Sequence, residues 1–386
     1  MAADTSQNMH PFRFFDNREK YLLFVNTCSE KSVIAERVGM ELDLITPNPR
    51  AFRLFDAGMG DGSVLTRVMR DLHRRFPGLP FVIVGKEISL EDTRLSFEKM
   101  ADRFSEHPLT VLVITNLYYS EAPWLRPNRA EDQEQLSWQE VALEGQTAFE
   151  FDVQIRSLED MLSEGWKTRA SRRTGNPLYV HPSVLVLYRA DQRQALEGVV
   201  PQPGATDDGA YDLIIAAQPY RARLPADRKL RYVLAPLARA LAPGGRMIVI
   251  QSTGHDPGME IIRKIWPDED PFQTPRHLLI EALKADLQES HRDLAVEAYA
   301  DERSLFRYQL RALPDEISSN IGTSTLLAAW NAAVYVAQIN DERLTAALGS
   351  GEYLSATREV LQRHGGLWFQ DETFVVARQG SDPPAG

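Results

Sequence analysis

The sequence predicts an α/β protein built on a doubly wound, mainly parallel sheet, and three observations support this prediction. Short apolar segments typical of buried strands alternate with amphipathic segments typical of helices. A glycine-rich loop joins the first of these strands to a helix, and a long polar segment interrupts the alternation before it resumes. Alternation at this spacing is typical of βαβ units, which assemble into parallel sheets.

The first half of the alternating pattern is expected at residues 51–120. Ahead of it, residues 1–50 predict a helical lead-in that breaks near 27–29 and is expected to act as a substrate lid. The strands and helices expected in the first half are 52–57, 64–72, 81–84, a helix ending near 104, and 111–115.

The polar segment at residues 121–208 is interpreted as an insertion with one helix near 149–166 and one strand near 184–188. We expect it to lie over the ligand-binding edge of the sheet and to cover the substrate. The alternative is a structural buttress without ligand contact.

The second half of the sheet, with helical additions and a closing strand, is expected at residues 209–378. Residues 379–386 are rich in Gly, Pro and Ser, and they predict a disordered tail. The elements expected in the second half are a strand at 211–217, a helix through 233–241, a turn at 243–245, a strand at 247–250, a helix through 326–339 and a strand at 367–377.

Composition narrows the classes of partner and location. The formal net charge of −11 disfavours binding to phosphate backbones, so nucleic acid is not the expected partner. The single cysteine, Cys28, excludes an internal disulfide, and no residue spacing predicts a metal site. The N-terminus lacks secretory-signal features and no apolar run reaches the length of a membrane span, which predicts a cytoplasmic protein. The oligomeric state is left open.

The glycine-rich loop, Asp56-Ala-Gly-Met-Gly-Asp-Gly62, predicts a nucleoside site together with Glu87. Glycines let the backbone turn sharply and approach a ligand, and an acid at the end of the next strand can accept ribose hydroxyl protons. No Lys-Ser/Thr step follows the glycines, which argues against a phosphate-binding loop. The alternative is a tight turn beside a solvated glutamate. The predicted cofactor-binding residues are Asp56, Gly58, Met59, Gly60, Gly62, Glu87, Ile88 and Gln218.

These motifs recur in the order seen in a known class of enzymes. The glycine loop, Glu87, the Tyr211-Asp212 step and the segment at 241–250 resemble the successive motifs of class I S-adenosylmethionine-dependent methyltransferases. The resemblance covers about residues 53–251, interrupted by the insertion. It implies a Rossmann-like methyltransferase sheet, with S-adenosyl-L-methionine as the cofactor.

The flanking segments resemble the histamine N-methyltransferase family of small-amine methyltransferases. The resemblance rests on Tyr21-Leu-Leu-Phe-Val-Asn-Thr-Cys-Ser-Glu-Lys31, on Asn331 and on Gly366-Leu-Trp-Phe-Gln-Asp371. It implies that Glu30 and Asp371 line the pocket of an amine substrate, and that Gln218 and Tyr220 follow the fourth strand. The chain departs from the family in its length, its insertion, Pro219, and an aspartate in place of an amide.

The catalytic residues implied by this resemblance are Glu30, Gln218, Tyr220 and Asp371. In methylation of a small amine, the two acids would accept the proton that the amine loses or would hold a cation in place. The alternatives are an O-, C- or protein-directed methyltransferase and a non-catalytic module that binds S-adenosylmethionine.

Overall fold

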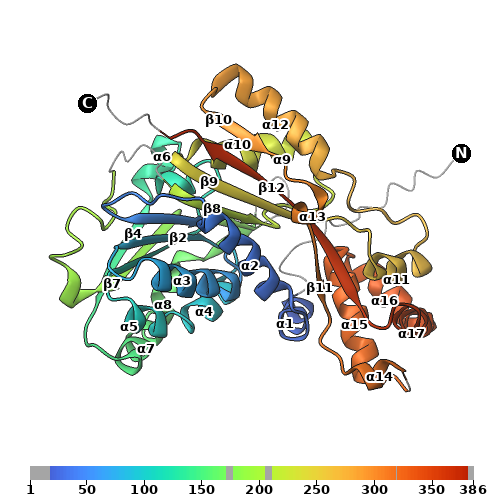
Figure 1. Ribbon diagram of the computed structural model, residues 1–386. Coiled ribbons are helices and arrows are strands. Elements are labelled where there is room, and N and C mark those ends of the chain that lie inside the picture. The colour runs from blue at the N-terminus through green and yellow to red at the C-terminus, as the bar shows by residue number, and fades with distance from the viewer. Residues whose placement is uncertain (1–17, 171–176, 205–210, 319, 381–386) are drawn as a thin grey trace, which may run out of the picture.

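The computed structural model describes residues 18–170, 177–204, 211–318 and 320–380 (Figure 1). Residues 1–17 of the predicted lead-in and 381–386 of the predicted tail lie outside this description. Ten of the described strands form one sheet in the order β10-β12-β9-β8-β1-β2-β3-β7-β4, with β11 pairing to β12, and the other two strands, β5 and β6, pair with each other. The strands of the ten-stranded sheet are β1 Phe52–Asp56, β2 Phe81–Lys86, β3 Thr110–Thr115, β4 Ser137–Leu143, β7 Ser183–Arg189, β8 Tyr211–Ala217, β9 Leu241–Ser252, β10 Leu294–Glu297, β11 Leu305–Gln309 and β12 Trp368–Arg378.

The centre of the sheet is parallel and doubly wound, as the sequence predicts. From β1 the chain adds β2 and β3 on one side, and it later adds β8 and β9 on the other side, all in parallel. The strand order therefore reverses between β1 and β8. Doubly wound sheets bind ligands at such a reversal, beyond the carboxyl ends of the strands.

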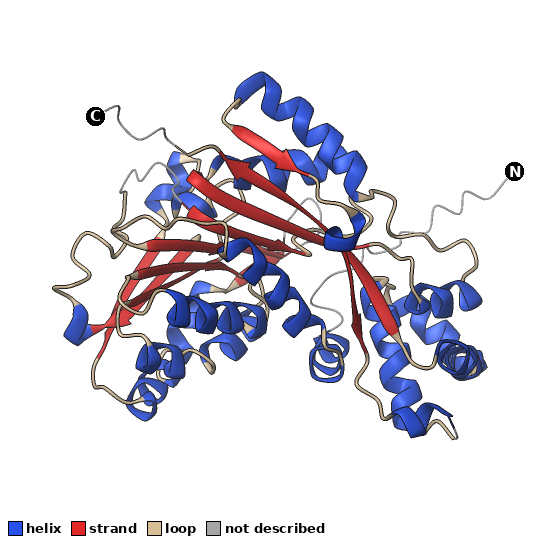
Figure 2. Cartoon of the chain, in the orientation of Figure 1, coloured by secondary structure: helices blue, strands red, loops and turns tan. Residues whose placement is uncertain are grey.

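Both faces of the sheet are covered by helices (Figure 2). Leu54 and Ile83 pack in a core that includes α2 (Glu30–Leu42) and α3 (Ser63–Arg75). Phe55 and Val84 belong to the core on the opposite face, with α10 (Ala235–Arg239) and α12 (Arg276–Ser290). Because both faces are buried, the parallel strands are almost continuously apolar, and this explains why they stand out in the sequence.

A group of helices, here called the helical lobe, lies beyond one end of the sheet (Figure 1). It comprises α11 (Pro257–Ile265), α14 (Pro314–Ser318), α15 (Thr323–Val336), α16 (Asp341–Ser350) and α17 (Glu352–His364). Strand β12 pairs with β9 in the sheet and with β11 at the lobe, so it connects the two parts. Helix α1 (Arg18–Thr27) packs on α15, which draws the N-terminal lead-in onto the lobe.

The remaining elements are short and lie between those already named. They are α4 Leu90–Phe97, α5 Ala101–Glu106, α6 Ala130–Glu134, α7 Ala148–Arg156, α8 Glu159–Gly165, β5 Thr168–Ala170, β6 Pro177–Tyr179, α9 Ala226–Lys229, the π-helical turn Leu230–Leu234, α13 Asp301–Ser304, and the 3₁₀ turns Ala122–Trp124 and Ala190–Gln192. No helix in the described ranges has the length and apolarity that a membrane crossing needs.

The segment at 121–208 differs from the expected cover in two ways. Its strands β4 and β7 extend the sheet, because β7 pairs antiparallel to β3 and β4 pairs parallel to β7. The single expected helix is two, α7 and α8, which pack against α5 and α4. Thr147 begins α7 with a capping box to Glu150, a signal that the sequence contained.

Two boundaries in the core also differ from expectation. The helix expected to end near residue 104 is divided into α4 and α5. Strand β9 begins at Leu241 and contains the expected turn at 243–245. At Gly245 an added Cβ would lie 2.5 Å from the carbonyl oxygen of Tyr211, so the strands approach closely there and only glycine fits.

Candidate functional site

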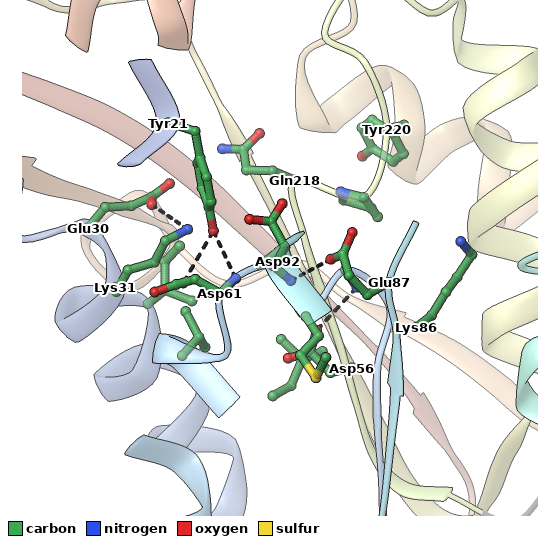
Figure 3. Close-up of a pocket in the computed structure, with 18 of the residues that line it drawn as sticks. Tyr21, Glu30, Lys31, Asp56, Asp61, Lys86, Glu87, Asp92, Gln218 and Tyr220 are labelled. Atoms are coloured by element: carbon green, nitrogen blue, oxygen red, sulfur yellow. Dashed lines mark hydrogen bonds and ion pairs between the residues drawn. The ribbon is translucent and has the colours of Figure 1, made fainter. Parts of the chain in front are cut away.

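A cavity of about 480 Å³ opens where the strand order reverses. Its walls come from the loops after β1, β2 and β8 and from α1, α2, β11 and the end of α15. The cavity therefore lies between the carboxyl edge of the sheet and the helical lobe. Its size falls within the range of sites for cofactors and small ligands. Figure 3 shows Glu30 and Lys31 on one side of it and Lys86 on the opposite side.

The glycine loop forms one wall of the cavity with Gly58, Met59 and Gly60. Gly60 has a φ of +54°, and an added Cβ would lie 2.6 Å from the Tyr21 hydroxyl oxygen. Gly62 does not line the cavity: its φ is +75°, and an added Cβ would meet Ser96 Cβ at 2.7 Å. Packing against α4 accounts for this glycine, and contact between Gly62 and the cofactor stays a prediction.

Glu87 lines the cavity with a carboxylate that the backbone holds in place. One oxygen accepts a hydrogen bond from Gly60 N at 2.7 Å, and the other accepts from Ile88 N at 2.6 Å and Ser89 N at 2.8 Å. Burial raises the pKa of Glu87, while these N–H groups and Lys86 act in the opposite direction. A fixed carboxylate at the end of β2 suits the hydroxyl groups of a ribose.

Two further carboxylates flank the glycine loop. Burial raises the pKa of Asp56 to about 6, although Gly58 N donates to it at 3.2 Å. Burial acts in the same direction on Asp61, but Lys31 and Lys99 outweigh it and lower its pKa. Asp61 lies directly before α3, where a bound phosphate would need to approach the helix N-terminus. Asp61 is paired with Lys99 at 2.7 Å, so the carboxylate of Asp56 is the one that disfavours a phosphate here and favours a cationic group.

Gln218, the residue after β8, lies in the cavity wall in an unusual backbone conformation. Its φ is +51°, which is rare for a residue other than glycine and is often found at functional sites. Its backbone N donates to the carbonyl of Ile250 at 2.9 Å, and its Nε2 donates to Ser252 Oγ at 2.9 Å. These bonds hold the amide at the cavity. Tyr220 also lines the cavity, and its hydroxyl donates to Gln251 Oε1 at 3.0 Å.

Asp371 lies behind the cavity wall and does not line the cavity. It is fully buried on β12, where it accepts hydrogen bonds from Ser252 Oγ at 2.9 Å and from Gln218 Nε2 at 3.5 Å. Burial, and then the charge of Glu30, raise its pKa well above the ordinary value. Asp371 therefore does not face a substrate in the cavity directly. It affects the cavity through Ser252 and Gln218, which donate hydrogen bonds to it.

Glu30 lines the cavity from the first turn of α2, as expected. Its Oε2 lies 2.9 Å from Lys31 Nζ, and Lys31 lines the cavity too. Burial lowers the pKa of Lys31, but the charges of Glu30, Tyr335 and Asp61 outweigh burial and raise it above the ordinary value. Lys31 is therefore the counter-ion of Glu30 and cannot serve as a base.

Several lining residues were not predicted from the sequence: Tyr21, Lys31, Asp61, Lys86, Tyr119, Tyr308 and Tyr335. Asp61 belongs to the glycine loop at 56–62, and Tyr21 and Lys31 belong to the segment at 21–31 that carries the family resemblance. Their positions in these motifs could have identified them as site residues. No sequence motif identified Tyr308, because β11 reaches the cavity only through its pairing with β12.

The segment at 121–208 touches this site from outside. None of its described residues lines the cavity, so the expectation of a direct cover is not met. Instead, Trp166 Nε1 donates to the carbonyl of Glu87 at 2.9 Å, and the Tyr179 hydroxyl donates to the carbonyl of Ile88. The segment supports the backbone beside Glu87, which corresponds to the buttress alternative.

No family model and no curated protein matches the chain. Among solved structures, geranyl diphosphate methyltransferase in complex with GPP and sinefungin aligns at 13% identity and a TM-score of 0.33, covering 90% of this chain and 78% of that one. Loganic acid methyltransferase with SAH aligns at 11% identity and a TM-score of 0.31, covering 91% and 92%. The rRNA methyltransferase aviRa from Streptomyces viridochromogenes aligns at 16% identity and a TM-score of 0.25, covering 57% and 73%. Likenesses this low carry no argument about activity, which rests on the site.

Proposed function

We propose that the chain is an S-adenosylmethionine-dependent methyltransferase that acts on a small molecule. One observation carries this proposal: the carboxylates of Asp56, Asp61 and Glu87 line a single cavity around the glycine loop, at the reversal of strand order. Glu87 provides an acceptor for ribose hydroxyls. Asp56 repels a diphosphate and attracts the positive charge of a sulfonium or an amino group, while Asp61 already has Lys99 as its ion-pair partner.

The proposed acceptor is an amine, and the support comes from the helical side of the cavity. Glu30 is 5% exposed and lines this side, and Gln218 and Tyr220 line the wall after β8. A cavity of about 480 Å³ suits a small acceptor, and the net charge of −11 disfavours nucleic acid.

Methyl transfer requires a nucleophile in line with the methyl group and without competing water. When bound, S-adenosylmethionine supplies a methyl group on a sulfonium, which becomes a neutral thioether when that group leaves. Gln218, held by Ser252 and by the backbone, is placed to orient the groups that meet there. Glu30 is placed to hold the amine by an N–H and to receive the proton that the product loses.

Titration calorimetry with S-adenosylmethionine, S-adenosylhomocysteine and NAD⁺ tests the cofactor. Both adenosyl compounds should bind and NAD⁺ should not. Glu87→Ala should weaken S-adenosylhomocysteine binding by about 1.5–3 kcal/mol, because hydrogen bonds to a charged group are lost. Glu98→Ala, an exposed glutamate at the end of α4, is the matched control and should bind normally.

Because Glu87 also accepts three backbone N–H groups, thermal unfolding is measured for each variant. A folded Glu87→Ala protein with unchanged affinity would remove Glu87 from the site. Tight binding of NAD⁺ would replace the cofactor assignment.

A further inference from the structure

The Tyr308 hydroxyl and Glu30 Oε2 are buried polar atoms at the cavity without a hydrogen-bond partner among the described residues. Tyr308 is 2% exposed and both residues line the cavity. Glu30 Oε2 has the Lys31 ammonium within 2.9 Å as an ion pair, whereas the Tyr308 hydroxyl has neither a hydrogen bond nor an ion pair in the described chain. Such atoms are rare in folded proteins, and each needs an explanation.

Packing does not explain the Tyr308 hydroxyl. The ring lies 5.2 Å from the ring of Phe369 and 6.0 Å from that of Phe24, measured between centroids. Phenylalanine would make the same ring contacts without a buried unpaired hydroxyl, and that hydroxyl destabilises the ligand-free fold. A ligand that hydrogen bonds to the hydroxyl supplies the reason for its presence.

Two groups in this part of the cavity can accept a hydrogen bond from a ligand: the Glu30 carboxylate and the Tyr308 hydroxyl, which can also donate. Burial raises the pKa of Tyr308 well above its ordinary value, and the charges of Asp371 and Glu30 raise it further, so it remains a neutral hydroxyl. Ser252 and Gln218 already donate to Asp371. A ligand with two N–H groups can therefore donate to Glu30 and to the Tyr308 hydroxyl oxygen at the same time.

Lys31 decides which form of an amine fits here. An isolated carboxylate would favour the ammonium form of the amine, which has no lone pair for attack. Because the ammonium of Lys31 lies 2.9 Å from Glu30, the pair is close to neutral. The Glu30–Lys31 pair thus accepts an N–H of a neutral amine without strongly favouring its protonated form.

We propose that the acceptor is a primary amine, whose two N–H groups donate to Glu30 Oε2 and to the Tyr308 hydroxyl while its lone pair faces the methyl group. This inference rests on the proposed function. The N–C bond forms as the C–S bond breaks, and the resulting secondary ammonium releases one proton to Glu30 or to water. The product then keeps one N–H for two acceptors, so it binds more weakly, and the reaction stops after one methyl group.

Binding measurements on the protein saturated with S-adenosylhomocysteine test this inference. The probes are benzylamine, N-methylbenzylamine and N,N-dimethylbenzylamine, compared at equal concentrations of unprotonated amine. Affinity should fall roughly 2- to 10-fold for each N–H lost, which corresponds to one neutral hydrogen bond. Turnover of benzylamine with S-adenosylmethionine should yield the monomethyl product by mass spectrometry.

Tyr308→Phe should erase the preference for benzylamine over its N-methyl derivative, while S-adenosylhomocysteine affinity stays unchanged. Its thermal unfolding temperature should not fall, because the hydroxyl has no partner in the free protein. Tyr188→Phe is the matched control: the Tyr188 hydroxyl donates to Glu140 at 2.6 Å on the far strands β7 and β4, so this variant should lose stability and keep the preference.

The outcomes separate this inference from the proposed function. If S-adenosylhomocysteine binds but the three amines bind equally, or none binds, the primary-amine inference is overturned and the cofactor assignment stands. If Tyr308→Phe keeps the preference, Tyr308 does not contact the amine and the inference is also overturned. Failure of S-adenosylhomocysteine to bind would overturn both.

Discussion

At the residue scale, the most informative feature is how charge is distributed around the cavity. Acids lie at the glycine loop and at the end of β2, whereas Glu30 on the helical side already has Lys31 beside it. At the glycine loop Lys99 pairs with Asp61 at 2.7 Å, so Asp56 and Glu87 are the carboxylates there that can attract a cation, whereas the Glu30–Lys31 pair offers a near-neutral hydrogen-bonding group. This matches a cationic cofactor beside a neutral nucleophile.

Asp56 makes this view testable through pH. Burial raises its pKa from the ordinary value of 3.8 to about 6 in the free protein. A bound cation favours the ionised form, so affinity for S-adenosylmethionine should fall as the pH drops below about 6, where Asp56 must first lose a proton. Calorimetry between pH 5 and pH 8 (roughly one unit below and two above this pKa) measures the effect.

Asp56→Asn is the comparison, because its amide oxygen can still accept from Gly58 N. Its affinity should be lower at pH 7 and nearly flat with pH. The stability of the fold changes with pH in the opposite direction. Because folding raises the pKa of this carboxyl, its protonated form stabilises the folded state, and this stabilisation is lost as the pH rises from the unfolded-state pKa to the folded-state pKa. Wild type should therefore lose stability relative to Asp56→Asn between about pH 4 and pH 6. Parallel pH profiles in both proteins would exclude Asp56 as the titrating group.

The sequence alone can predict which residues lie together at the cavity where chemistry and chain position coincide. The glycine loop comes directly after β1 and Glu87 directly after β2. Because these strands are parallel, both lie at the same edge of the sheet. Gly62 lies outside the cavity lining, because a glycine that accommodates packing on Ser96 looks the same in the sequence as one that accommodates a ligand. Asp371 lies next to the cavity wall instead of lining the cavity. Its neighbours are set by the register of β12 with β9, which local sequence patterns do not reveal.

At the element scale, the segment at 121–208 was the hardest part to predict. Strand β4 is half exposed at the sheet edge and lacks the continuous apolar character of the central strands, so its sequence resembles a polar loop. The helix pair α7 and α8 bends at Ser157, which no proline or glycine marks. The role of the segment as a buttress depends on contacts that composition does not reveal.

Trp166 provides a test of this buttress. Trp166→Phe removes the hydrogen bond from Nε1 to the carbonyl of Glu87 and should weaken S-adenosylhomocysteine binding roughly 2- to 10-fold, since Glu87 loses one support. Trp138→Phe on β4 is the matched control, because Trp138 Nε1 has no partner among the described residues. Calorimetry compares the two variants. Equal affinities in both would mean that the segment does not support the cofactor side of the cavity.

At the scale of the whole molecule, helices α1 and α2 connect the sheet to the helical lobe. Asn331 Nδ2 of α15 donates to the carbonyl of Lys20 at 2.9 Å, and α2 packs on α3 beside the sheet. The Tyr21 hydroxyl accepts from Asp61 N at 3.0 Å, which joins α1 to the glycine loop. The sequence predicted a helical lead-in near the substrate, but the lobe itself depends on the long β12 and could not be placed from local patterns.

This arrangement predicts that cofactor binding reduces hydrogen exchange both at the sheet and in the helical lobe. Hydrogen exchange measured by mass spectrometry should slow on addition of S-adenosylhomocysteine in the glycine loop, and also in α1, α2 and the end of α15, because all of them line the cavity. Exchange in β4 and α7, at the far edge, should not change. Asn331→Ala removes the hydrogen bond from α15 to the carbonyl of Lys20, which is worth about 1 kcal/mol, and should raise exchange in α1 of the free protein. If protection stays confined to the loop and to residues 87–89, the lobe does not participate in cofactor binding, and the cavity's helical side would serve the acceptor alone.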